Sequence, residues 1–258
     1  MCVYDFFLNN FDPLTVIFYL IVGFTAGIIK GIVGFAMPMI LLSGMTLIMP
    51  ADAALAALIL PTLFSNIQQA NAQGISSALS SIRQFKMFLI IGAFFLLLGA
   101  LLTPFIPSKL FLGVMGCLIV SFSLLQILGP KFQINRSNRV ATVCFAAISG
   151  FIGGISGVWG PPTVAYLTAL NTEKNEQIRI QGVIYGLGAV LLLLGHMLSG
   201  IFSWETAPLS AALIIPTLFG VWVGTSVRGC FDQKTFGTTT LLVLLIAGGN
   251  LIRRAWLG

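Results

Sequence analysis

The sequence has 258 residues, of which 57% are hydrophobic and only 8% are charged. A soluble domain carries about a quarter charged residues, so this chain could not cover its surface with polar groups in water. We therefore expect it to lie in a lipid bilayer. The net charge of +6 does not indicate a nucleic-acid partner, because the basic residues are scattered along the chain. Four distant cysteines and a single histidine predict neither a metal site nor another cofactor.

Ten apolar segments follow one another along the chain. They fall at about 13–33, 36–49, 52–70, 86–105, 109–128, 139–158, 161–170, 178–199, 206–227 and 235–252. Most approach the ~20 residues with which a helix crosses ~30 Å of hydrocarbon. The second and seventh reach only ~15–20 Å as helices, so each is a candidate broken helix or an arm of a re-entrant hairpin. The sequence predicts an all-α polytopic membrane protein.

The basic residues between these segments predict the orientation in the membrane. With the N-terminus outside, nine basic residues lie in or near the inside loops: Arg83, Lys86, Lys131, Arg136, Arg139, Lys174, Arg179, Arg228 and Lys234. Three lie outside: Lys109, Arg253 and Arg254. Because inside loops of membrane proteins are enriched in Lys and Arg, we expect a multi-pass protein with both termini outside.

A glycine pattern recurs in the two halves of the chain. Three glycines spaced G-x-x-x-G-x-x-G are repeated 126 positions later: Gly27, Gly31 and Gly34, then Gly153, Gly157 and Gly160. A glycine and a lysine repeat at an offset of 125: Gly99 and Lys109, then Gly224 and Lys234. We therefore expect a first repeat at 12–128, a cytoplasmic linker at 129–138 and a second repeat at 139–255.

The number of crossings in each half determines how the two repeats are related. Each half holds five segments, or three crossings and a hairpin, and both numbers are odd. The two repeats must then be inverted relative to one another. Inverted repeats with a site at their interface near the bilayer midplane are a recurring plan of secondary transporters.

Proline residues beside each glycine pattern predict breaks in the membrane helices. Pro161 and Pro162 follow Gly160 and suit the first turn of a new helix, whose free N–H groups bind anions. A similar break is expected between Gly34 and Pro38. Simple helix packing with a kink explains the same pattern, and such breaks are tolerated in a membrane only where they face protein or a watery cavity.

Lys30 favours an anion site at these breaks. An ammonium within a membrane helix costs about 2.5–3.5 kcal/mol and needs a partner. No acidic residue lies within the apolar stretches to pair with it, unless Asp52 or Glu205 folds inward from the end of its segment. A bound anion is then the natural partner, unless the lysine extends its stem to the membrane interface. In the glycine register the counterpart of Lys30 is Ser156. The two motifs are then equivalent in position, but they are not identical, because one carries an ammonium and the other a hydroxyl.

Two polar stripes could line a route to this site. One follows a helix face through Thr62, Asn66, Gln69 and Gln73, and the other through Gln181, Tyr185 and His196. Helix–helix hydrogen bonds explain such stripes equally well. The candidate substrate-binding residues are Lys30, Gly31, Gly34, Asn66, Ser156, Gly157, Trp159, Gly160, Thr163, Gln181 and Tyr185.

The sequence holds no catalytic cluster, no nucleotide motif and no embedded carboxylate pair. We therefore expect no enzyme, and a transport process driven by the substrate gradient and the membrane potential. An anion that leaves a negative interior gains about 2.3 kcal/mol per charge and 100 mV, which favours export.

The run G-F-x-G-G-I-S-G-V-W-G-P-P from Gly150 to Pro162, with its weaker counterpart in the first half, resembles the TauE/SafE family, also called the toluene sulfonate uptake permeases. The resemblance covers nearly the whole chain. It implies a bacterial inner-membrane exporter of sulfite, sulfoacetate or other small sulfur-containing or organic anions, with a site around Lys30–Pro38 and Ser156–Thr163. The first half departs from the family at Phe35 and Ala36, where further glycines are usual.

Other functions stay open beside the one that the resemblance implies. A drug/metabolite-type permease with ten helices and a passive anion channel are the alternatives. The expected partners are a small anionic substrate and the lipid bilayer, with a homodimer as a further option and no nucleic acid.

Overall fold

The computed structural model describes residues 12–128, 133–135, 138–228 and 233–257. The first half of the chain forms α2 (Pro13–Val33), α3 (Met37–Met45), α4 (Ala51–Asn71), α5 (Ile75–Gln84), α6 (Lys86–Leu102), the 3-10 turn η1 (Thr103–Phe105) and α7 (Ser108–Leu128). The second half forms α8 (Arg139–Ser156), α9 (Gly160–Ala169), α10 (Lys174–Leu198), α11 (Ala207–Ala212), α12 (Ile214–Val227) and α13 (Gln233–Leu257). All regular structure in the described residues is helical, as the composition predicts.

Seven stretches of the described chain are long and apolar enough to cross a membrane: 13–33, 51–71, 86–105, 108–128, 139–156, 175–198 and 207–227. They match seven of the ten predicted segments. The segments predicted as short form α3, with nine residues, and α9, with ten, and helices of ~15 Å cannot cross the hydrocarbon alone. The chain is a multi-pass membrane protein.

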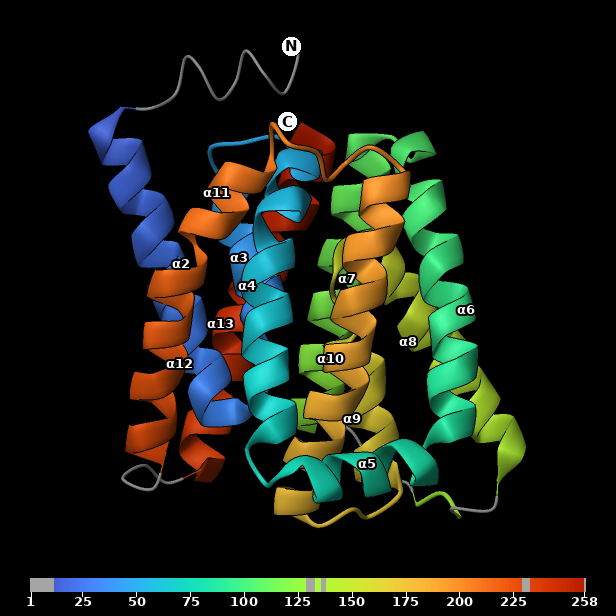
Figure 1. The fold of residues 1–258 in the computed structure, drawn as a ribbon. Helices are drawn as coiled ribbons and strands as arrows, with labels where there is room; N and C mark the ends of the chain where they lie inside the picture. The colour runs from blue at the N-terminus through green and yellow to red at the C-terminus, as the bar shows by residue number, and fades with distance from the viewer. Residues whose placement is uncertain (1–11, 129–132, 136–137, 229–232, 258) are drawn as a thin grey trace.

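Helix α5 is absent from the sequence prediction and lies across one end of the bundle (Figure 1). Its sequence ISSALSSIRQ is too short and too rich in serine to resemble a membrane segment. The helix is amphipathic: Ala78 and Ser81 are buried against the bundle, while Ile75 and Leu79 are exposed.

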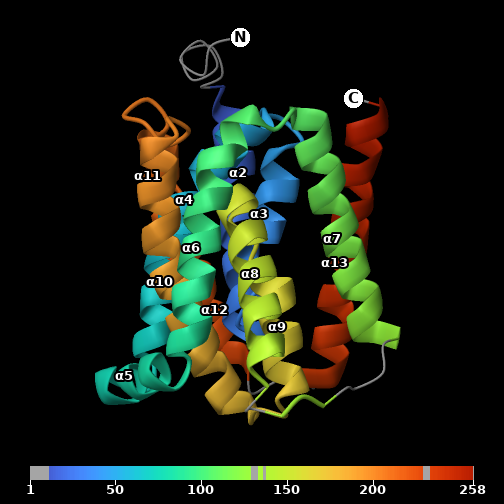
Figure 2. The same cartoon turned by 90° about the vertical axis from the view of Figure 1, so that its right-hand side faces the viewer.

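Both ends of the described chain lie at the same end of the bundle, since α2 begins and α13 ends there (Figures 1 and 2). At the opposite end lie α5 and the first turns of α8 and α10, which carry Arg83, Arg139 and Arg179. Arg83, Arg139 and Arg179 thus lie at the end of the bundle opposite the termini, as in the loop assignment on which the predicted orientation rests. Most of the predicted linker, 129–132 and 136–137, lies outside the described residues, and so do Lys131 and Arg136.

The bundle is built from helix pairs that each join one helix of the first half to one of the second. α2 packs along α12, α6 along α8, α4 along α10 and α7 along α13. α2 enters the bundle from the end where the termini lie, and α8 enters it from the opposite end (Figures 1 and 2).

Glycines bring these paired backbones close together. A Cβ on Gly27 would lie 2.2 Å from the carbonyl oxygen of Thr217, and one on Gly154 would lie 2.0 Å from that of Leu96. No side chain fits into such spaces. Small residues therefore determine the distance between the helices, as is usual in membrane bundles.

The two helix breaks correspond at an offset different from the predicted one. α2 ends at Gly34 with φ +87°, and α8 ends at Gly157 with φ +71°. Each of these left-handed glycines donates its N–H to a carbonyl four residues earlier, that of Lys30 or of Gly153. The following helices begin at Met37 and Gly160, so the offset is 123 positions.

Counted back from these helix ends, the position of Lys30 matches that of Gly153, and not that of Ser156 as in the glycine register. The sequence could not separate the two registers. Glycines at 150, 154 and 157 have the same spacing as those at 153, 157 and 160, and only the helix ends distinguish them.

Candidate functional site

A small cavity in the bundle brings both helix breaks together with one buried cation. The residues that line it are Lys30, Phe35, Ala36, Pro38, Met39, Asn66, Val158, Trp159, Gly160 and Tyr185. They come from the ends and beginnings of α2, α3 and α9 and from the middle of α4 and α10. The cavity measures about 10 Å³, which is room for about one water molecule.

Lys30 lies one turn before the end of α2 and is only 3% exposed. Its ammonium Nζ donates a hydrogen bond to Oδ1 of Asn66 on α4. Asn66 in turn donates from Nδ2 to the carbonyl oxygen of Tyr185, at 3.2 Å. The lysine is thus held by a neutral amide, and no carboxylate within the described ranges forms an ion pair with it.

The first turns of two short helices point toward the same cavity. α3 begins at Met37 after Ala36, whose φ of +75° is rare for a residue with a side chain, and Pro38 occupies its first turn. α9 begins at Gly160, followed by Pro161. The first N–H groups of a helix lack partners within it and carry a partial positive charge. Both tips therefore add to the positive potential that Lys30 creates.

Aromatic rings close the cavity on the side of α9. The ring centroids of Trp159 and Tyr185 lie 6.0 Å apart, and both side chains are almost fully buried. The Tyr185 hydroxyl lies 3.5 Å from the carbonyl oxygen of Gly160. These groups hold the α9 tip beside α10.

Five of the predicted site residues thus line one cavity: Lys30, Asn66, Trp159, Gly160 and Tyr185. Two others, Ser156 and Thr163, use their hydroxyls within the second break. Ser156 Oγ donates to the carbonyl of Ile152, at 2.7 Å, and accepts from the N–H of Val158, at 3.1 Å. Thr163 Oγ1 donates to the carbonyl of Trp159, at 2.9 Å. These hydroxyls hold the break in shape and leave little capacity for a ligand.

The remaining predicted glycines act through the backbone. Gly31 packs against Val221 on α12, and its carbonyl accepts a hydrogen bond of 3.0 Å from Nε of Arg228. Gly34 and Gly157 end their helices in the left-handed conformation, which side chains other than hydrogen disfavour. They shape the two breaks and do not line the cavity.

Gln181 lies beside Gly34 and is not in the cavity lining: a Cβ on Gly34 would lie 3.3 Å from its Oε1. It is 2% exposed, and its Oε1 has no hydrogen-bond partner among the described residues. The neighbouring Gln69 donates from Nε2 to the carbonyl of Ile178, at 3.0 Å, while its own Oε1 is also unpartnered. Two amides with free acceptor oxygens therefore lie beside the first break.

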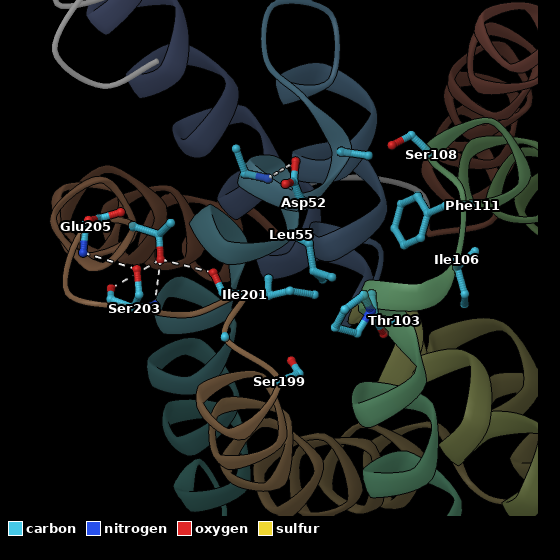
Figure 3. A pocket seen from close by; sticks show the side chains of 15 residues that line it. Asp52, Leu55, Thr103, Ile106, Ser108, Phe111, Ser199, Ile201, Ser203 and Glu205 are labelled. Carbon is cyan, nitrogen blue, oxygen red and sulfur yellow. Dashed lines mark hydrogen bonds between the residues drawn. The ribbon is translucent and has the colours of Figure 1, made fainter. Parts of the chain in front are cut away.

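A much larger hollow, which we call the vestibule, opens at the end of the bundle where the termini lie. It measures about 400 Å³ and lies between the start of α4, the connection from η1 to α7 and the connection from α10 to α11 (Figure 3). Its lining includes Asp52, Leu55, Thr103, Ser199 and Glu205. The sequence analysis missed the vestibule, because its lining comes from one helix start and two connections that are far apart in the chain.

His196, the only histidine of the chain, lies on α10 three residues before Ser199 of the vestibule lining. It is fully buried, and its Nε2 lies 3.0 Å from the carbonyl oxygen of Gly154 on α8. Its Nδ1 lies 3.4 Å from Oγ of Ser199 at the vestibule wall. The ring thus joins α10 to α8 and does not reach the cavity at Lys30.

Comparison with known proteins identifies the family of this chain. The sequence model of the sulfite exporter TauE/SafE family matches residues 19–251, which is nearly the whole chain. No curated protein and no solved structure gives a significant match. The chain belongs to the TauE/SafE family, a family of membrane transporters and not of enzymes.

Proposed function

We propose that this member of the TauE/SafE family exports small sulfur-containing or organic anions, such as sulfite or sulfoacetate, which bind to Lys30 between the tips of α3 and α9. The observation that carries the proposal is the state of Lys30. A buried cation deep in a membrane bundle needs a partner of opposite charge. Among the described residues its ammonium hydrogen-bonds to a neutral amide and forms no ion pair, and an anion in the adjoining cavity would supply the missing charge.

The arrangement of the helices supports two inverted repeats around this site. Helix pairs α2–α12 and α8–α6 have the same kind of close glycine contact. α2 and α8 run in opposite directions through the bundle (Figure 1), and each ends in a left-handed glycine followed by a short helix. Such halves exchange roles when a transporter opens first to one side and then to the other.

The direction of transport follows from charge and orientation. We propose that the protein lies in the bacterial inner membrane with both termini outside, so that the basic ends of α5, α8 and α10 face the cytoplasm. A cytoplasmic anion then meets a positive surface and leaves a negative interior, which supplies about 2.3 kcal/mol per charge and 100 mV. No coupling ion is needed for export.

Two observations favour a carrier of this family over the alternatives. The family match argues against a drug/metabolite-type permease. A passive channel needs a continuous path, whereas the cavity at Lys30 has room for about one water molecule. So little open space is expected of a carrier between its two open states.

The proposal is tested with the purified protein in proteoliposomes and a panel of sulfite, sulfoacetate, taurine, thiosulfate and lactate. We expect saturable transport with counterflow for at least one sulfur-containing anion. In Lys30→Met the flux should fall by about fivefold to a thousandfold, because an ion pair at ~4 Å is worth about 1–4 kcal/mol for effective dielectric constants of about 80 to 20.

The matched control is Lys109→Met, which removes an exposed lysine at the start of α7. It should change the flux less than twofold. Equal fluxes in Lys30→Met and the parent would show that Lys30 does not bind the anion, and ohmic single-channel currents would contradict a carrier.

A further inference from the structure

The two left-handed glycines each face a pair of side chains from α4 and α10. A Cβ on Gly34 would lie 3.3 Å from Oε1 of Gln181 and 3.6 Å from Nε2 of Gln69. A Cβ on Gly157 would lie 2.7 Å from Cδ1 of Leu58 and 3.4 Å from Cδ2 of Leu192. The first glycine therefore faces two amides, and the second faces two leucines.

These two pairs occupy corresponding places in the two halves. The offset of 123 positions that relates Gly34 to Gly157 also relates Leu58 to Gln181 and Gln69 to Leu192. α4 and α10 thus present the same two positions at each break. The geometry is shared, and the chemistry of the side chains differs.

The order of residues along α4 places the two pairs on opposite sides of the cavity. α4 starts at the vestibule, where Leu55 belongs to the lining (Figure 3). Leu58, Asn66 and Gln69 follow on the same helix face, at intervals of three, eight and three residues. Leu58 therefore lies between the vestibule and the cavity, and Gln69 lies beyond the cavity toward the other end of the bundle.

α10 shows the same order in the opposite direction. Gln181 lies near its first turns, Tyr185 at the cavity, and Leu192 between the cavity and Ser199 of the vestibule. Leu58 and Leu192 have no exposed surface. Both lie beside Gly157, and we call this pair the outer closure; the pair Gln69 and Gln181 beside Gly34 is the inner closure.

The two closures differ in what they admit. A constriction lined by leucine side chains stays dry and excludes ions by dewetting. A constriction lined by amides retains hydrogen-bonding capacity, and here two amide oxygens are buried and unpartnered. Water or a polar substrate can satisfy them, because an unmet buried acceptor costs about 1–3 kcal/mol.

We infer that Leu58 and Leu192 determine the sidedness of transport: they form a dry closure toward the vestibule, while Gln69 and Gln181 form a hydrated entry from the opposite side. The identity of the anion rests on the function proposed above. The asymmetry itself rests on contacts that are independent of the substrate. Anions reach Lys30 from the amide side and leave through the vestibule when the leucine pair separates.

The first experiment transfers the chemistry of one closure to the other. Leu58→Gln and Leu192→Gln place amides at the outer closure, and we expect entry of external sulfite from the vestibule side to rise about tenfold or more, since each change removes one buried leucine side chain. Leu55→Gln, one turn nearer the vestibule opening, is the control and should leave entry unchanged. Parental entry rates in both closure variants would overturn the inference.

The second experiment reports on the closure without any transport substrate. Its parent has the four native cysteines, Cys2, Cys117, Cys144 and Cys230, replaced by serine. Thr62→Cys, which lies between Leu58 and Asn66 on α4, carries the reporter thiol. The probe is a membrane-impermeant, sulfonate-bearing methanethiosulfonate, added separately to spheroplasts and to inside-out vesicles.

We expect the reporter to react slowly from the vestibule side and about tenfold or more faster once Leu58→Gln is added. Ser108→Cys, in the vestibule lining, should react quickly in both backgrounds and shows which side the vestibule faces. Fast labelling of Thr62→Cys with Leu58 intact would contradict a dry closure. The labelling rates can agree with these expectations while no anion of the panel is transported. In that case the proposed substrate class is wrong, and the assignment of the dry closure to Leu58 is still supported.

Discussion

Asn66→Asp places a carboxylate where a neutral amide now accepts a hydrogen bond from Lys30. The new side chain has almost the same size, so the substitution changes charge and leaves packing nearly intact. If Lys30 attracts the transported anion, this internal carboxylate should take the place of the anion. The variant is therefore expected to be more stable than the parent and defective in transport.

The size of both effects can be estimated from the contacts of Asn66. An ion pair at ~4 Å with an effective dielectric constant of ~20 gives about 4 kcal/mol. The carboxylate no longer donates to the carbonyl of Tyr185, a bond of 3.2 Å, and the loss of this partner costs about 1–3 kcal/mol. The net stabilisation is about 1–3 kcal/mol, and a substrate that loses the same attraction binds up to about a thousandfold more weakly.

Thermal unfolding in detergent and transport in proteoliposomes measure the two effects on one preparation. For a chain of this size, 1 kcal/mol shifts the unfolding midpoint by about 2–4 °C, so we expect a rise of several degrees together with a loss of flux. The double variant Lys30→Met with Asn66→Asp is the control, and its unpaired carboxylate should lower stability below that of Lys30→Met alone. Parental flux in Asn66→Asp, with an unfolding midpoint at or below that of the parent, would refute an anion partner for Lys30.

Two further predictions concern the helix contacts and the inner closure. Gly27→Ala should lower stability by about 1–3 kcal/mol or more, because its Cβ would lie 2.2 Å from the carbonyl oxygen of Thr217, whereas Gly249→Ala, with no atom within 4 Å, should be neutral or stabilising by up to about 1 kcal/mol. Equal unfolding midpoints would show that α2 and α12 do not need this close approach. Gln69→Leu combined with Gln181→Leu makes the inner closure apolar and should slow transport about tenfold or more without loss of folding, and undiminished flux in this variant would argue against a hydrated entry.

Much of the fold could be predicted from the sequence. The length and apolarity of the segments predicted membrane helices. No water is present in the hydrocarbon to hydrogen-bond the backbone, so a spanning segment must satisfy its own N–H and C=O groups, as a helix does. The prolines beside each glycine pattern predicted breaks near Gly160 and between Gly34 and Pro38, since proline cannot continue a helix but suits its first turn. The motif from Gly150 to Pro162 predicted the family, which the match to residues 19–251 confirms.

The candidate site was predictable only in part. Lys30 stood out because a charge within an apolar segment is costly, whatever surrounds it. Its contact with Asn66, and the use of the Ser156 hydroxyl within its own break, depend on which helices meet and at what depth. The register between the halves was ambiguous for the same reason: two sets of glycines have the same spacing, and only packing selects one.

The vestibule and the two closures were decided entirely by the tertiary structure. Spacing along the sequence determines which residues share a helix face, so Thr62 and Asn66 could be placed on one stripe of α4. It does not determine which residue of α10 lies opposite each of them. That choice follows from how closely backbones approach at their glycines, which is a property of the folded bundle and of no single segment.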